Sequence, residues 1–239
     1  MTGMIDPAPP HGLRPGQLGM LMKGHVITGD VAVTIVDLAI RELIQISQSP
    51  DEQDEEWFIT PALECEPGHQ RDALAAYERT LLTGMAKRLT DVRAAPDAAV
   101  RLSMLAPQMT GVLSRTKEEI TREVVHRGWV HRRRHEELTT AGKELARDVC
   151  SFQEALGRLV STQDTGSLPT RLLPYTLHFG LIGNDGSPLA GFAHAWVRAF
   201  AVLPGWGPQR PARKPSIDEQ MMSPQVMAMA WLGRSTNSG

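Results

Sequence analysis

Cysteine and aromatic residues are scarce in this chain. Its 239 residues include two cysteines, Cys65 and Cys150, and aromatic side chains make up 5% of the sequence. Two cysteines so far apart supply neither a disulfide framework nor the closely spaced thiolates of a zinc site. The stretch GNDG at 183–186 predicts a turn and matches no phosphate-binding loop. We therefore expect no metal and no cofactor.

Long apolar runs are missing as well. The most apolar stretch, 189–206, contains His194 and Arg198, whereas a membrane span needs about 20 largely uncharged residues. The first residues, MTGMIDPAPPHG, lack the basic start and apolar run of a secretion signal. Unpaired cysteines are typical of a reducing compartment. We expect a soluble, cytoplasmic protein without membrane insertion.

Neither sign of charge dominates the sequence. It contains 25 Lys and Arg against 27 Asp and Glu, for a formal net charge of −2. No global positive field therefore draws the protein to nucleic acid, so any binding of an anionic partner must be local. With 41% hydrophobic and 22% charged residues, the composition is that of a globular protein.

One pattern occurs twice in the chain: an apolar helix, a short strand, a charged turn and a second strand. In the first copy the segment DVAVTIVDLAIRELIQI (30–46) contains the helix and, at 44–46, the first strand, and it precedes the acidic turn DEQDEE (51–56) and WFIT. In the second, EEITREVVHRGWV (118–130) precedes HRRRHEEL. This order is typical of a winged helix. It predicts a mainly α fold with short β-hairpins, in which tandem winged-helix-like units are followed by a C-terminal helical subdomain.

The same pattern predicts the domain organisation. The expected parts are a flexible N-terminus (1–12), a first winged-helix-like unit (13–66), a connector helix (67–95), a second winged-helix-like unit (96–138), a C-terminal helical subdomain (139–203), and a Pro-rich linker with a Met-rich tail (204–239). Within the first helix, Thr34, Asp37 and Arg41 form a narrow polar stripe, and we expect Asp37 and Arg41 to be an exposed pair.

The two turns carry opposite charge. The acidic first turn favours a basic protein partner or simple solubility. The second is basic and indicates a site for an anion or nucleic acid, because guanidinium groups make forked contacts with phosphate and carboxylate. Its candidate binding residues are Arg127, His131, Arg132, Arg133 and Arg134. The alternative is a solvated hairpin partly neutralised by its own glutamates. Attraction between the oppositely charged turns of two molecules could also form a homodimer.

Two further groups of residues are functional candidates. Tyr175, His178 and His194 could line a polar pocket for acid–base chemistry, although a histidine in an apolar segment is more often a hydrogen-bonded core residue. The tail offers flexible apolar side chains suited to binding a partner, although it could also fold back on its own domain. These are Met221, Met222, Met227, Met229 and Trp231. The aromatic residues Phe192, Trp196 and Phe200 recur every four positions, which predicts a core-facing stripe.

Seven segments appear in the same order as in a family of bacterial predicted membrane proteins of unknown function, and 13–206 resembles that family's cytosolic C-terminal region. They are RPGQLGMLM (14–22), DVAVTIVDLAIRELIQI (30–46), AAYERTLL (75–82), EVVHRGWV (123–130), SFQEALGRLVST (151–162), LLPYTLHFGL (172–181) and HAWVRAF (194–200). The resemblance implies winged-helix-like subdomains and no assigned catalytic residues. The family's spans would fall at HEELTTAGKELARDV, which is too polar here to insert. The chain thus resembles a soluble relative.

These observations lead to one preferred function and two alternatives. The preferred one is a non-catalytic binding protein that recognises a protein or peptide through its winged-helix-like units. The second is a nucleic-acid-binding regulator that uses the arginine-rich hairpin. The third is an enzyme of small-molecule or peptide (secondary) metabolism with its site near Tyr175, His178 and His194.

Overall fold

The computed structural model of this chain describes residues 7–49, 56–61, 74–92, 99–162, 168–182 and 188–201. All of them belong to one compact unit, Met1–Gly207, and the second unit is Pro208–Gly239. The five candidate residues of the Met-rich tail therefore lie outside the described residues. So do Cys65 and residues 51–55 of the acidic turn.

Helices make up most of the described structure. The α-helices are α1 (Leu18–Lys23), α2 (Thr28–Ile40), α4 (Ala76–Val92), α5 (Leu102–Leu105), α6 (Thr110–His126), α7 (Thr140–Thr162), α8 (Leu173–His178) and α9 (Pro188–Ala201). Short 3-10 turns are η1 (Pro10–Gly12), η2 (Pro15–Gln17), η3 (Ala106–Gln108) and η5 (Thr170–Leu172). Helix α4 lies within the range predicted for the connector helix, 67–95.

The strands form two small antiparallel sheets. They are β1 (Ile44–Gln48), β2 (Trp57–Pro61), β3 (Val100–Arg101), β4 (Val130–His131) and β5 (Arg134–Leu138). The order is β1-β2-β3 in the three-stranded sheet, and β4 pairs with β5 in the other. The predicted strand pairs after α2 and after α6 are therefore confirmed. The mainly helical fold class is confirmed with them, whereas the winged-helix arrangement stays a prediction.

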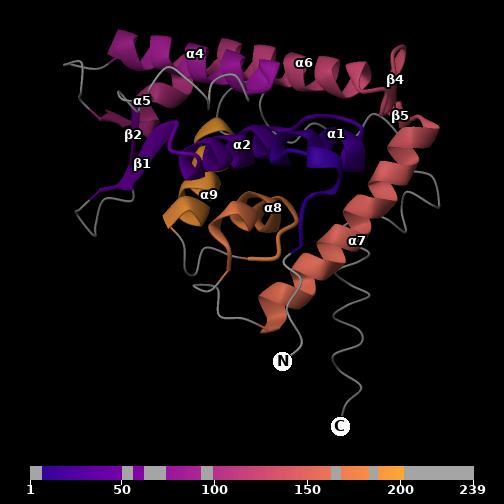
Figure 1. Cartoon of the computed structure of the whole chain (residues 1–239). Coiled ribbons are helices and arrows are strands. Elements are labelled where there is room, and N and C mark those ends of the chain that lie inside the picture. Colours follow the sequence, from indigo (N-terminus) through magenta and orange to yellow (C-terminus); the bar gives the residue numbers. More distant parts are fainter. Residues whose placement is uncertain are drawn as a thin grey trace. The chain divides into compact units, whose positions relative to one another are not determined.

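Helix α2 is the centre of the described unit. It packs against α6 on one side and against α8 and α9 on the other, as Figure 1 shows. Val31, Ile35, Val36 and Leu38 are buried along it, because its apolar residues cover most of the helix circumference. The aromatic stripe of α9 is confirmed as core, since Phe192, Trp196 and Phe200 are all fully buried.

The two predicted winged-helix-like ranges share one apolar cluster. Residues from α2, β1, β2, α4, α5, α6 and α9 all contribute to it. In the sheet, β3 from the second range pairs with β2 from the first, and Val100 lies opposite Ile59. Helices α4 and α6 also pack along each other. The described residues of both ranges therefore bury their apolar surface together.

The polar stripe of α2 differs from its prediction. Thr34 is buried, and Arg41 donates from Nη1 to Asp37 Oδ2 and to Glu78 Oε1, each at 2.9 Å. The side chain of Glu78 is fully buried, and Arg14 Nη1 also donates to its Oε1, at 3.1 Å. Burial raises the pKa of Asp37, while Arg41 opposes that shift. The prediction of an exposed pair was wrong because α4 supplies a third charge that sequence spacing cannot show.

Candidate anion-binding cleft

Helix α6 presents two chemically different faces. Its buried face consists of Leu113, Thr116, Ile120 and Val124. These residues recur at spacings of three and four, which keeps them on one side of a helix. The neighbouring face carries Lys117, Glu118, Thr121, Arg122 and Val125. This second face forms one wall of a cleft.

Gly128 lies in the turn between α6 and β4. Its φ is +72°, in the left-handed region that glycine adopts without strain. The N–H of Gly128 donates to Val125 O at 3.0 Å, and the N–H of Trp129 donates to Val124 O at 3.2 Å. These bonds close the helix. Helix α6 therefore ends just before Gly128.

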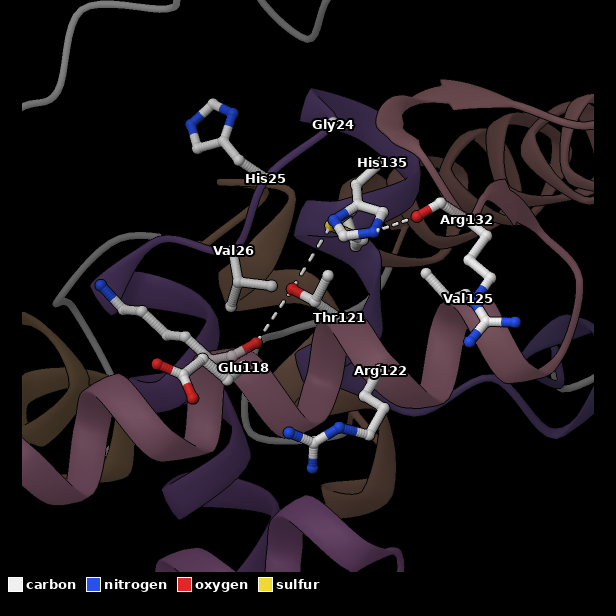
Figure 2. Close-up of a pocket in the computed structure, with 11 residues that line it drawn as sticks. Gly24, His25, Val26, Glu118, Thr121, Arg122, Val125, Arg132 and His135 are labelled. Atoms are coloured by element: carbon white, nitrogen blue, oxygen red, sulfur yellow. Dashed lines mark hydrogen bonds between the residues drawn. The ribbon is translucent and has the colours of Figure 1, made fainter.

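The β4–β5 hairpin forms the second wall. His131 lies opposite Arg134 in the register, so Arg132 and Arg133 make the turn between the strands. His135 then reaches back, and its Nε2 lies 2.7 Å from Arg132 O. The turn thereby presents one arginine and one histidine side chain to the cleft (Figure 2).

The third wall comes from the segment between α1 and α2. Gly24, with φ +73°, ends α1, and its N–H donates to Met20 O at 3.2 Å. His25 follows, with its Nδ1 2.9 Å from Lys23 O. Val26 adds an apolar surface beside it. Residues far apart in the sequence therefore meet around one space.

The resulting cleft has a volume of about 610 Å³. Figure 2 shows its side chains arranged along α6, the hairpin and the α1–α2 segment. It is lined by Met20, Gly24, His25, Val26, Lys117, Glu118, Thr121, Arg122, Val125, Arg132 and His135. Apolar groups alternate there with cationic ones, a composition suited to an anionic group carried on an apolar body.

The fixed charges of the cleft are mainly positive. The lining contains three cations, Lys117, Arg122 and Arg132, and a single carboxylate, Glu118. Burial lowers the pKa of Lys117, and the carboxylate of Asp30 opposes that shift. An amine partly removed from water gains more from an incoming anion than an exposed one does. The fixed charge of the cleft is therefore complementary to that of an anionic ligand.

The two imidazoles have defined orientations. Carbonyl oxygens only accept hydrogen bonds, so the hydrogen lies on Nδ1 of His25 and on Nε2 of His135, the nitrogens that face Lys23 O and Arg132 O. Each ring keeps its other nitrogen for a ligand.

The basic residues predicted from the sequence have different environments. Arg132 lines the cleft, and His131 and Arg133 are exposed on the hairpin. Arg127 donates from Nη2 to Glu123 Oε1 at 3.0 Å, and its guanidinium lies 5.0 Å from the ring centroid of Trp129. A stacked, paired arginine has less to offer a ligand.

Arg134 is paired in a similar way. Its Nη1 donates to Glu137 Oε1 at 3.1 Å, which matches the expectation that glutamates partly neutralise this hairpin. Within the described part of the chain, the guanidiniums of Arg132 and Arg133 make no hydrogen bond or ion pair. Among the arginines predicted to bind an anion, those of the turn therefore have the guanidiniums most accessible to a ligand.

Sequence reasoning missed three of the cationic or titratable groups around the cleft: His25, Lys117 and Arg122. Helical spacing could have joined Lys117 to Thr121 on one face of α6. No local pattern could have placed His25 beside them, because its position depends on how α1 packs against α6.

The candidate acid–base residues have three separate surroundings. The buried Tyr175 hydroxyl donates to Leu13 O at 2.7 Å, and burial raises its pKa. Nδ1 of His178 lies 3.2 Å from Oδ1 of Asp30, and both side chains are buried. His194 is exposed on α9. His178 therefore matches the alternative of a core histidine with a polar partner.

Asp30 has one orphaned oxygen. Its Oδ2 accepts the N–H of Ile27 at 2.7 Å. Oδ1 lies within ion-pair distance of His178 but makes no hydrogen bond, because the contact lacks hydrogen-bond geometry.

Among the residues that the structure describes, no group of three or more His, Cys, Asp or Glu side chains is placed to hold a metal ion.

Helix length and hydropathy bear on the membrane question. None of the helices in the described ranges is both long enough and apolar enough to span a bilayer.

Comparison with known proteins adds no identity: no family model, curated protein or solved structure matches this chain.

Proposed function

We propose that this protein is a non-catalytic binding protein that recognises an acidic segment of a protein or peptide partner. The observation that carries this proposal is the cleft whose cationic wall contains Lys117, Arg122 and Arg132 and whose apolar surface contains Met20 and Val125. In this proposal, α6 and its hairpin form the second of two winged-helix-like units. The composition of the protein and its resemblance to a cytosolic region favour a cytoplasmic location.

The mixed character of the cleft supports a peptide ligand. A polypeptide segment brings carboxylates and apolar side chains together, so it can satisfy cations and cover apolar surface in one contact. Nucleic acid would present a continuous row of phosphates. The carboxylate of Glu118 in the cleft and the net charge of −2 of the whole chain would both repel such a row of phosphates.

Affinity capture from lysate of the source organism tests the proposal. The bait is the full chain, compared with an Arg122→Glu/Arg132→Glu variant. A matched control, Arg147→Glu/Arg158→Glu, reverses the same amount of charge at exposed positions of α7. We expect a partner that wild type and control retain and that the cleft variant loses. Equal retention by all three proteins would contradict binding through the cleft.

Nucleic-acid binding is the second candidate. It is favoured by the turn, where the side chains of Arg132 and Arg133 are exposed and make no hydrogen bond or ion pair with other described residues. Anisotropy titrations with labelled single- and double-stranded DNA and RNA distinguish the two functions. Affinity that falls steeply between about 50 and 200 mM salt, and that Arg133→Ala weakens, would favour this candidate. Absence of saturable binding would favour the peptide.

A further inference from the structure

We infer that the anionic group recognised by the cleft is a phosphate monoester, so that the partner is phosphorylated on a side chain. This inference rests on the proposed function, because it specifies the chemistry of the ligand at the same site. The observation behind it is that several fixed cations and two imidazoles surround one space of about 610 Å³.

Charge and donor geometry favour phosphate over carboxylate. A phosphate monoester carries about −1.5 to −2 charges at neutral pH and offers three strong acceptor oxygens. A carboxylate carries one charge and two oxygens. Among the residues that line the cleft, Lys117 and Arg122 belong to α6 and Arg132 to the hairpin, and a group with three acceptors offers oxygens to donors of both elements. Guanidinium forks match phosphate oxygens in pairs.

The arginines can engage a ligand at little cost. The guanidinium of Arg132 makes no hydrogen bond or ion pair in the described part of the chain. Arg122 pairs with Glu119, but the two side chains are 65% and 26% exposed, and such exposed pairs contribute little stability. An incoming dianion can therefore compete for both guanidiniums.

The apolar lining fits the stem of a phosphorylated residue. Met20, Val26 and Val125 lie among the cationic residues of the cleft. Thr121 Oγ1 lies 3.9 Å from Met20 Sδ and donates to Lys117 O at 3.0 Å. This surface can contact the carbon atoms beside a phosphate group, whereas free inorganic phosphate leaves it uncovered.

Binding of oriented peptide libraries to the full-length protein tests the inference. Otherwise degenerate short peptides carry a fixed central phosphoserine, phosphothreonine or phosphotyrosine. Matched libraries carry glutamate or the unmodified residue at that position. We expect the protein to retain phosphorylated peptides at least about tenfold better than the glutamate library, since phosphate adds charge and acceptors. Arg132→Ala and Lys117→Met should each abolish this preference, whereas Arg147→Ala should preserve it.

The other outcomes separate the inference from the proposed function. Equal retention of the glutamate and phosphorylated libraries would overturn the inference and leave recognition of acidic peptides standing. Inorganic phosphate that displaces the peptides at equal concentration would overturn it in favour of a free anion. Competition by single-stranded RNA at equal concentration would do so in favour of nucleic acid. Retention of none of the libraries by wild type would overturn both proposals, provided that circular dichroism shows a folded protein.

Discussion

At the scale of single residues, Gly19 and Asp30 show how a buried charge is accommodated. A Cβ atom at Gly19 would lie 1.9 Å from Asp30 Oδ2, so the missing side chain is what leaves room for the carboxylate. That carboxylate accepts the N–H of Ile27 and lies against His178. The contact joins α1, the start of α2 and the end of α8.

Substitution at Gly19 should therefore be costly. We expect Gly19→Ala to lower the free energy of unfolding by about 1–3 kcal/mol, as overpacking in a filled core does. A matched control is Gly111→Ala in α6, where a Cβ meets no atom within 4 Å. There alanine should be neutral or add up to about 1 kcal/mol. Urea denaturation of the two variants measures both; equal effects would contradict the close contact with Asp30.

The two tyrosines of the sequence allow a prediction on pH. Burial raises the pKa of Tyr77 and of Tyr175 in the folded protein. Because both folded pKa values exceed the unfolded value of about 10, the stability from neutral phenols is complete below about pH 10 and is lost as the pH rises further. We expect no tyrosinate absorbance while the protein is folded, and ionisation of both residues together on alkaline unfolding. Titration of either tyrosine near pH 10 with unchanged circular dichroism would contradict this.

At the scale of elements, Glu78 holds η2, α2 and α4 together. Its side chain is fully buried, and it accepts hydrogen bonds from Arg14, Arg41 and the N–H of Ala75. The two arginines keep their outer parts near solvent, at 28% and 24% exposure. A buried carboxylate with several donors depends on all of them, because unmet charge in the interior is expensive.

Replacing this carboxylate by its amide tests its role in joining the elements. We expect Glu78→Gln to lower the free energy of unfolding by about 3–5 kcal/mol, because Arg14 and Arg41 then both lose the charge of Glu78, although Arg41 still pairs with Asp37. Glu144→Gln, at an exposed position of α7, should change it by less than about 0.5 kcal/mol. The comparison is made by urea denaturation at neutral pH. Similar stabilities of the two variants would show that Glu78 does not connect the elements.

At the scale of the whole described unit, the predicted subdomains share their core. The largest apolar cluster takes residues from α2 near the start of the chain and from α9 near the end of the described region. The antiparallel pairing of β2 with β3 and the packing of α4 on α6 cross the boundary between the two predicted winged-helix-like ranges. Among the residues that the structure describes, neither range forms a complete core of its own.

A shared core predicts cooperative unfolding. We expect tryptophan fluorescence and far-ultraviolet circular dichroism to report one coincident transition in urea. Fragments 1–95 and 96–203, expressed separately, should lack cooperative unfolding because each exposes apolar surface that the other covers. Two resolved transitions, or a fragment that folds alone, would contradict a shared core.

Much of the secondary structure follows from short sequence patterns. The apolar spacing of Leu113, Ile120 and Val124 predicts α6, and Gly128 predicts its end. The aromatic spacing in α9 predicts a buried face. The basic hairpin after α6 is also visible in the sequence, which is how Arg132 was identified. The acid–base pocket stays a prediction. The contacts of Tyr175 and His178 could not be predicted from the sequence, because their partners belong to segments far away in the chain.

Short sequence patterns predict most of the described helices and strands and their apolar faces, because helical and strand periodicity and turn-forming residues act over a few neighbouring positions. The packing of these elements, by contrast, established which charges meet. It placed Glu78 against Arg41, Asp30 against His178, and His25 beside the cationic face of α6. Such contacts depend on the distance between side chains after packing, and packing joins residues without regard to their separation in sequence.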